Sequence, residues 1–242
     1  MKTGTNKKEY GLPFNADMVR AMIEGRKTMT RRIPTFMNCM VDGKRVNKEF
    51  WTQLDIKNGT LIKDLYKDEI SLLVINIKTK QFHSVRPIWK EGDCFWVKEK
   101  FVYYPMAGDC GLAGPIFEAD NATMDNILKI YEKKWCPPMF MPRCASRITA
   151  EMTSVKFEFL QDISELDSLN EGTPLKYFNK IHGTLVASNG TTTGEFINGT
   201  AVNAFSKLWD SIYGKTEFAW KENYPLIAVS FKIQEVQHKI TE

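Results

Sequence analysis

The stretch from Ile148 to Leu160 is the clearest strand in the sequence, and it constrains the fold more than any other feature. Apolar and polar residues alternate along it, a pattern that is typical of a strand that buries one face. The apolar residues form two alternating sets, Ile148, Ala150 and Met152, then Val155, Phe157 and Phe159. The change from even to odd positions predicts a bulge near Ser154. Shorter strands are predicted at 70–77, 94–101, 115–120 and 226–233.

Strands outnumber helices in this pattern, and the helices lie between strands without the regularity of βαβ units. The pattern therefore predicts an α+β fold or a partly open β-barrel with peripheral helices. No internal repeat or linker divides the 242 residues, so a single domain is predicted. Residues 34–89 are predicted to be a strand-rich insertion. Residues 173–202, with the polar run Ser188–Gly194, are predicted to be an exposed loop or lid.

Short helices are predicted where a capping residue precedes an apolar period and a glycine follows it. They run from Asn15 to Gly25, from Ser164 to Gly172 and from Asn203 to Gly214, and a fourth is predicted at 124–133. Leu166 and Leu169 form the apolar pair of the second helix. The apolar face of the third helix comprises Phe205, Leu208, Trp209 and Ile212.

The segment Gly25–Arg32, here called the basic segment, presents four cations and two threonine hydroxyls directly after the first helix. Crowded cations repel one another, which favours a nearby anion or carboxylate and predicts a site for a polyanion or a polar small molecule. The alternative is a solvated turn that happens to be basic. Lys27 and Thr30 are three residues apart, so their tips can converge in a tight loop. A partly desolvated lysine loses proton affinity and can act as a base toward a hydroxyl.

A second group of candidate binding residues follows three prolines, Pro137, Pro138 and Pro142. Prolines exclude a helix and fix an extended, stiff path, on which Arg143, Ser146 and Arg147 can hold donors in place. Arginine forks suit phosphate or carboxylate. The alternative is that one arginine, more readily Arg147, only ties the loop to backbone carbonyls.

Glu99 lies at the end of the strand predicted at 94–101. A carboxylate there could pair with Lys27 or Arg31 inside the protein. The alternative is an ion pair at the surface, which contributes about 0–1 kcal/mol. Glu171 lies at the end of the second helix, where the helix dipole disfavours a carboxylate. A residue placed against local preference favours a functional role.

Composition excludes several protein classes. The five cysteines are odd in number and lack C-x-x-C spacing, so they are predicted to be free thiols in a reducing compartment rather than a disulfide frame or zinc site. The three histidines are scattered, and neither a metal nor a cofactor is predicted. No apolar leader or membrane span is found, so a cytoplasmic protein without a membrane partner is expected. The net charge of +4 permits a nucleic-acid partner without requiring one.

Several motifs resemble the ASCH family of the PUA-like superfamily. The basic segment resembles the family's G-x-K-T-x-T-x-R, and Gly92–Glu99 is similar to its G-D-x-L/W-x-V-R/K-E pattern. Trp135–Arg147 resembles W-x-P-x-x-x-M-P-R-x-A-S-R of the phage and prophage branch, the longest match. Leu160–Gly172 and Phe205–Gly214 resemble two further family segments. The resemblance covers about residues 11–33, 90–172 and 203–233, and it implies a PUA-like β-barrel encoded by a phage or its bacterial host.

The resemblance also implies a function, namely recognition of RNA or a modified nucleobase in a cleft at the barrel mouth. A small bacterial relative is an amidohydrolase that acts on acetylated cytidine, and its catalytic residues correspond to Lys27, Thr30 and, through a less similar segment, Glu171. Lys27 would activate Thr30 for attack on the amide carbonyl, and Glu171 would handle the leaving-group proton. Either Glu99 or Glu171 is the working carboxylate. The expected binding residues are Arg26, Arg31, Arg32, Glu99, Arg143 and Ser146.

The chain departs from that relative in its length, its insertions and the presence of Arg31 before Arg32. One alternative is therefore a non-catalytic nucleic-acid-binding module of phage origin, in which cations grip phosphates and aromatic rings stack on bases. Another is a protein that interacts with the phage host through its insertions.

Overall fold

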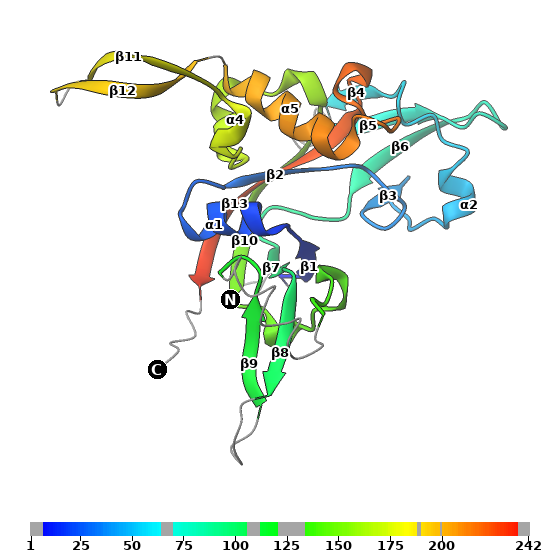
Figure 1. The fold of residues 1–242 in the computed structure, drawn as a ribbon. Coiled ribbons are helices and arrows are strands. Elements are labelled where there is room, and N and C mark those ends of the chain that lie inside the picture. The colour runs from blue at the N-terminus through cyan, green and yellow to red at the C-terminus, as the bar shows by residue number, and fades with distance from the viewer. Residues whose placement is uncertain are drawn as a thin grey trace, which may run out of the picture. The chain divides into compact units, whose positions relative to one another are not determined.

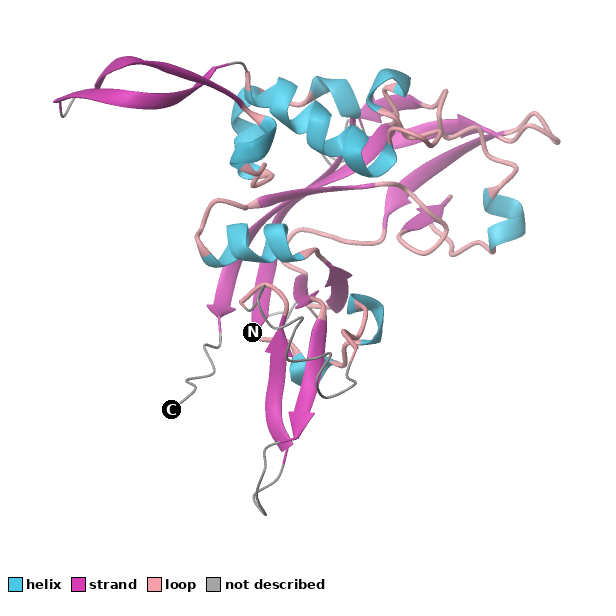
Figure 2. Ribbon diagram, viewed as in Figure 1, coloured by secondary structure: helices cyan, strands magenta, loops and turns pink. Residues whose placement is uncertain are grey.

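The computed structural model describes residues 7–63, 70–105, 112–120, 134–187, 190–198 and 200–236. Strands predominate and the helices are few and short, which confirms the α+β class (Figure 2). The helices are α1 (Ala16–Ile23), α2 (Lys48–Trp51), α4 (Glu165–Asn170) and α5 (Ala201–Tyr213). Single 3-10 turns are η1 (Pro138–Phe140), η2 (Arg143–Ala145), η3 (Leu160–Asp162), η4 (Leu175–Tyr177) and η5 (Trp220–Glu222).

The strands are labelled in chain order (Figure 1). They are β1 (Glu9–Pro13), β2 (Met29–Arg32), β3 (Cys39–Val41), β4 (Thr60–Lys63), β5 (Ile70–Ile75), β6 (Phe82–Pro87), β7 (Cys94–Lys98), β8 (Phe101–Pro105), β9 (Leu112–Phe117), β10 (Ile148–Phe159), β11 (Asn179–Ala187), β12 (Gly190–Asn198) and β13 (Pro225–Val236). The strands predicted from alternation are therefore confirmed, with ends that differ by a few residues. β10 runs unbroken through Ser154, the position of the predicted bulge.

The strands form four sheets. A five-stranded sheet has the order β1-β7-β10-β13-β2, and a four-stranded sheet has the order β3-β6-β5-β4. The pairs β8-β9 and β11-β12 form separate two-stranded sheets. Neither of the larger sheets closes into a barrel among the described strands, because their end strands do not pair with each other. The segment predicted to be a strand-rich insertion supplies the whole four-stranded sheet.

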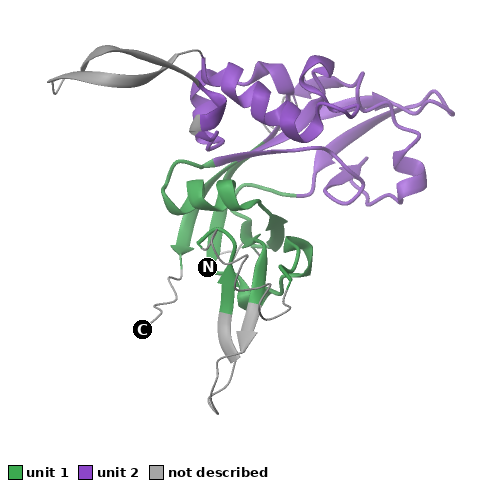
Figure 3. Cartoon of the chain, viewed as in Figure 1, with its two compact units in different colours: residues 1–28, 89–155, 230–242 green, residues 29–88, 156–229 purple. Residues whose placement is uncertain are grey.

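The chain divides into two compact units (Figure 3). Unit 1 comprises residues 1–28, 89–155 and 230–242, and unit 2 comprises residues 29–88 and 156–229. Each unit is described by itself.

Part of the core of unit 1 lies on one face of β7. Parallel pairing sets Gly11 of β1 opposite Trp96, and antiparallel pairing sets Thr149 of β10 opposite the same residue. Phe95 therefore points to the other face, where it is fully buried. Its ring lies 5.1 Å from that of Phe231 in an edge-to-face arrangement. This geometry is favoured for aromatic pairs and fixes the core of the unit.

Helix α1 begins and ends where its sequence predicts. Asn15 caps it, since its Oδ1 accepts a hydrogen bond from the Met18 N–H at 2.9 Å. Gly25 ends it with a φ of +74°, a conformation that a side chain would strain. The Ala21 carbonyl then accepts hydrogen bonds from the N–H groups of Arg26 and Lys27. These bonds turn the basic segment back toward the helix.

A glycine in β1 makes room for Trp96. A Cβ at Gly11 would lie 2.7 Å from Trp96 Cζ2 and 2.9 Å from Cε2. We expect Gly11→Ala to lower the free energy of unfolding by about 1–3 kcal/mol, because the rigid indole must move. Urea denaturation measures this change. In a Trp96→Leu background the same substitution should cost less, and an equal cost in both backgrounds would contradict the proposed contact.

The sheet of unit 2 is built around buried aliphatic residues. Leu72 pairs with Val85 across β5 and β6, and both side chains are fully buried. Asp42, beside β3, binds Nδ1 of His83 at 2.7 Å and accepts the Ser84 N–H at 2.8 Å. These contacts tie the turn after β3 to the neighbouring strand.

Two helix predictions in unit 2 require correction. Thr200, and not Asn203, caps α5: its Oγ1 accepts the N–H of Asn203 at 3.1 Å. Ser164 caps α4 as predicted. However, the expected apolar pair of α4, Leu166 and Leu169, is exposed, because this short helix faces the interior with its polar side.

The predicted loop or lid at 173–202 is also wrong in part. Residues 179–187 and 190–198 form the hairpin β11-β12, with Gly183 opposite Gly194. Threonines are common in strands, and this tract lacks the apolar alternation by which a strand is recognised. Outside the described residues lie the helix predicted at 124–133 and Cys110; the other four cysteines are free thiols, as predicted.

Candidate functional site

The basic segment is mostly buried. Lys27, Thr30 and Arg31 are 0%, 4% and 6% exposed. Arg26 is exposed and pairs with Glu24, with Nε donating to Oε2 at 2.7 Å. The interpretation of this segment as a solvated turn is therefore wrong for its buried residues, whereas Gly25 and Arg26 are exposed. Burying a lysine and an arginine costs free energy unless polar partners surround them.

In unit 2, Arg31 lies among three carboxylates, and we call these four residues the Arg31 cluster. Its Nη1 donates to Glu171 Oε1 at 3.0 Å. Its Nη2 forms an ion pair with Glu158 and lies 3.6 Å from Asp167 Oδ2. The Arg31 side chain is wholly enclosed, and its guanidinium carbon lies 5.9 Å from the centre of the Phe205 ring.

Local structure places each member of the Arg31 cluster. Arg31 lies in β2, and Glu158 lies near the end of β10. Asp167 is in the first turn of α4, and Glu171 is its C-terminal capping residue. The Arg31 guanidinium offsets the unfavourable interaction between the Glu171 carboxylate and the C-terminal end of the helix dipole. The predicted residues Arg31 and Glu171 are thus brought together.

The surroundings of the Arg31 cluster add two further cations. Lys156 Nζ lies 3.0 Å from Glu158 Oε2. Burial lowers the pKa of Arg32, and nearby Tyr213 and Glu171 oppose that change. Arg31 Nε is a buried donor with no hydrogen-bond acceptor among the described residues. Such a donor fits an acceptor atom of a ligand or a water molecule.

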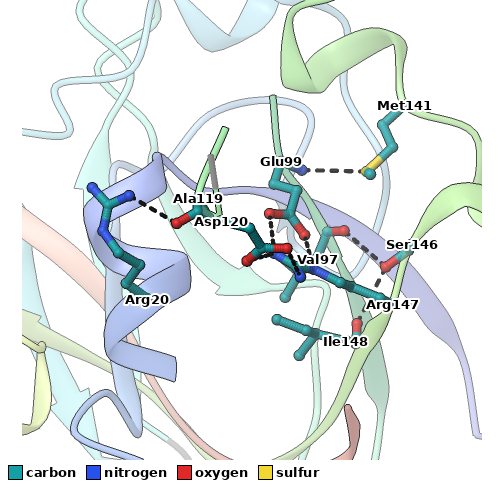
Figure 4. Close-up of polar contacts among 9 residues, drawn as sticks. All are labelled: Arg20, Val97, Glu99, Ala119, Asp120, Met141, Ser146, Arg147 and Ile148. Atoms are coloured by element: carbon teal, nitrogen blue, oxygen red, sulfur yellow. Dashed lines mark hydrogen bonds and ion pairs between the residues drawn. The ribbon is translucent and has the colours of Figure 1, made fainter. Parts of the chain in front are cut away.

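In unit 1, Arg147, Glu99 and Asp120 form a second cluster, the Arg147 cluster (Figure 4). Arg147 Nε and Nη2 donate to the two oxygens of Glu99 at 2.9 and 3.0 Å. Nη2 also donates to Asp120 Oδ1 at 2.9 Å, and Nη1 donates to Oδ2. The guanidinium carbon lies 4.1 Å from the centre of the Phe117 ring. All three guanidinium nitrogens of Arg147 therefore donate hydrogen bonds inside the protein.

The Arg147 cluster corrects two expectations. The hydrogen-bond partner of the Glu99 carboxylate is Arg147, whereas Lys27 or Arg31 was expected. Arg147 binds carboxylates rather than the backbone carbonyls that were the alternative. Burial raises the pKa of Glu99, an effect that its ion pair with Arg147 opposes. This arrangement is typical of a buried ion pair that holds segments following different strands together, and we call this role a structural tie.

The other two candidate residues that follow the three prolines, Ser146 and Arg143, also have partners. Ser146 is buried, and its hydroxyl lies 2.8 Å from the Val97 carbonyl and 3.3 Å from the Ile148 carbonyl. Arg143 is at the surface, where Nε and Nη2 donate to Glu9 Oε1 at 3.0 and 2.8 Å.

Sequence reasoning did not single out Glu158, Asp167 or Asp120. Glu158 carried a usable signal, because it is a carboxylate between two aromatic residues of an apolar strand. Among the described residues, no group of three or more His, Cys, Asp or Glu side chains is placed to hold a metal ion.

Comparison with known proteins finds no matching family model, no matching curated protein and no matching solved structure. No helix within the described ranges is both long and apolar enough to cross a membrane.

Proposed function

We propose that this chain is an ASCH-type protein of PUA-like fold that binds RNA or a modified nucleoside and hydrolyses the amide of an N-acylated cytidine. The strand arrangement supports this assignment. The five strands of the largest sheet come from the segments with family resemblance, about residues 11–33, 90–172 and 203–233. The two stretches outside the resemblance form pairings of their own, the four-stranded sheet and the β11-β12 hairpin.

The burial of Lys27 is the observation that carries the proposal. Burial excludes bulk water from the Lys27 amine, which suits a group that exchanges a proton with a neighbouring hydroxyl. Thr30 is also buried and lies three residues further along the chain. Three residues span at most about 11 Å, so the chain itself keeps the two close. A buried cation and hydroxyl at this spacing fit a base and its nucleophile better than a surface charge run.

The proposed reaction proceeds in two stages. Lys27 takes the Thr30 hydroxyl proton, and Thr30 Oγ1 attacks the amide carbonyl carbon. The C–N bond breaks, and the proton passes through Glu171 to the leaving nitrogen, which releases the cytidine amine. Water then hydrolyses the threonine ester, which releases the acid and restores Thr30. Arg31 orients Glu171 through Oε1, and its Nε can donate to an acceptor on the substrate.

Turnover of N-acetylcytidine, followed by chromatography, tests this proposal. We expect the wild type to release cytidine, and Lys27→Met or Thr30→Val to lower kcat/KM by about a hundredfold or more. Lys215→Met, which removes an exposed lysine far along the sequence, should leave turnover unchanged. Circular dichroism of each variant shows whether it is folded. No release of cytidine from any N-acylated cytidine by the wild type would overturn the proposed hydrolysis.

The second candidate is a non-catalytic nucleic-acid-binding module. It is favoured by the Lys98 ammonium, which lies 5.1 Å above the Trp96 ring at the surface of unit 1. Cations beside aromatic rings suit a chain of phosphates and bases. Turnover by the wild type separates the two candidates, because a binding module would release no cytidine.

A further inference from the structure

Two large apolar side chains stand out from unit 1. Met139 and Phe140 are each 67% exposed, and we call them the apolar tip. The next residue, Met141, is 2% exposed and packs with Phe101 and Phe117 in a buried cluster. The chain therefore anchors itself with one methionine and presents the two preceding side chains to solvent. Exposed apolar groups of this size often mark a binding surface.

The apolar tip stands on a stiff base. It lies in the 3-10 turn η1, in which the Phe140 and Met141 N–H groups donate to the carbonyls of Pro137 and Pro138 at 3.1 and 3.0 Å. Before it, Cys136 exchanges two backbone hydrogen bonds with Phe101, at 2.8 and 3.2 Å. The prolines and these bonds limit the conformations of the turn. Binding through the tip would therefore cost little conformational entropy.

One cation contacts the apolar tip, and two more lie close to it in sequence. Lys98 Nζ donates to the Met139 carbonyl at 2.8 Å, and within the described ranges it pairs with no carboxylate. Lys134 is exposed and likewise forms no ion pair with a described residue. Arg143 pairs with Glu9, but both are nearly half exposed, and such pairs are weak. The apolar tip is thus bound by one cation and flanked in sequence by two others.

We propose that the apolar tip and its cations bind single-stranded nucleic acid. Phe140 offers a ring on which a base can stack, and Met139 extends that apolar surface. Lys98, which contacts the tip, and Lys134 and Arg143, which are close to it in sequence, supply the positive charge that phosphates require. An anionic membrane is a poorer fit, because two side chains bury little apolar area in a bilayer. The inference rests on nucleic-acid binding, which both candidate functions include, and it does not require amide hydrolysis.

The binding test uses two phenylalanines of equal exposure. Phe140 is 67% exposed, and Phe82 in unit 2 is 68% exposed. Fluorescence anisotropy with a labelled oligouridylate about 12 nucleotides long measures the dissociation constant. We expect Phe140→Ala to weaken binding by about tenfold. Phe82→Ala, the matched control, should leave the dissociation constant unchanged.

Salt and charge variants test the phosphate contacts. Binding by the wild type should weaken between about 50 mM and about 200 mM salt. Lys98→Met should reduce the slope of that dependence by about 0.7. Absence of binding by the wild type, or equal weakening by Phe140→Ala and Phe82→Ala, would overturn the proposal. So would binding to phosphatidylserine vesicles that depends on Phe140 in place of oligonucleotide binding.

The same variants keep the two proposals distinguishable. Phe140→Ala should hydrolyse N-acetylcytidine at the wild-type rate, since Phe140 takes no part in the proposed reaction. Lys27→Met should still bind the oligonucleotide. Loss of both activities in Phe140→Ala, in a variant shown to be folded, would contradict a separate binding surface.

Discussion

Arg147→Met is expected to lower the free energy of unfolding by about 3–5 kcal/mol. The substitution preserves most of the side-chain volume and removes the cation that neutralises Glu99 and Asp120. Glu99 is 1% exposed, so its carboxylate would remain charged in the interior without a partner. Leaving one member of a buried ion pair uncompensated is among the most damaging single changes. Urea denaturation followed by tryptophan fluorescence measures the loss.

The loss caused by Arg147→Met should shrink as the pH falls. Burial already raises the pKa of Glu99 above its ordinary value of 4.5, and removal of Arg147 removes the main opposing influence. When folding raises the pKa of a carboxyl group, the folded protein is stabilised as the pH falls below that pKa. This stabilisation is lost as the pH rises through the same pKa. Titrations at about pH 5 and about pH 8 should therefore give the smaller difference at the lower pH.

Two further variants test the cause. Glu99→Leu combined with Arg147→Met removes both buried charges, and it should be more stable than Arg147→Met alone. Lys100→Met breaks the half-exposed pair with Glu118 and should cost about 0–1 kcal/mol. A cost for Arg147→Met as small as that for Lys100→Met would show that the Arg147 cluster is not a structural tie.

Arg31→Met is expected to cost about as much as Arg147→Met, about 3–5 kcal/mol, and to reduce the proposed hydrolysis as well. The substitution would leave Glu158 and Glu171 charged and buried, with Asp167 beside them. The Arg31 side chain has no exposed surface, so water cannot take its place without rearrangement. Thermal unfolding measures the stability, and kcat and KM for N-acetylcytidine measure the function.

Arg26 provides the matched control for Arg31. It lies in the same basic segment, pairs with Glu24, and is about half exposed. Arg26→Met should therefore change the free energy of unfolding by about 0–1 kcal/mol. Glu158→Gln combined with Arg31→Met should be more stable than Arg31→Met alone, because the double variant lacks one of the carboxylates that Arg31 neutralises. Equal costs for Arg26→Met and Arg31→Met would contradict the ion-pair geometry of the cluster.

Local features of this protein were determined by the sequence. Asn15 and Ser164 cap helices, and Gly25 ends one, because these contacts join residues three or four positions apart. The strands at 94–98 and 148–159 follow from alternation, since a sheet face buries every second residue. The burial of Phe95 and Val97 follows in the same way.

Short segments without a clear period were decided elsewhere. Leu166 and Leu169 are exposed because α4 has only six residues and its packing, not its apolar content, sets its orientation. The polar tract at 190–198 becomes a strand because it pairs with β11, a contact that alternation within the tract does not encode. Threonine and asparagine can both cap a helix, so the sequence did not distinguish Thr200 from Asn203, and the structure shows that Thr200 is the cap.

The two charge clusters were decided by tertiary structure alone. Sequence reasoning placed Glu99, Arg31 and Glu171 among the candidate residues but assigned Glu99 the wrong partner. Arg147 lies 48 positions from Glu99, and Arg31 lies 140 positions from Glu171. No local rule selects one partner over such separations. The pairing of strands and the path of the segment that contains Pro137, Pro138 and Pro142 bring the charges together. Because water is excluded there, each buried charge then requires its partner.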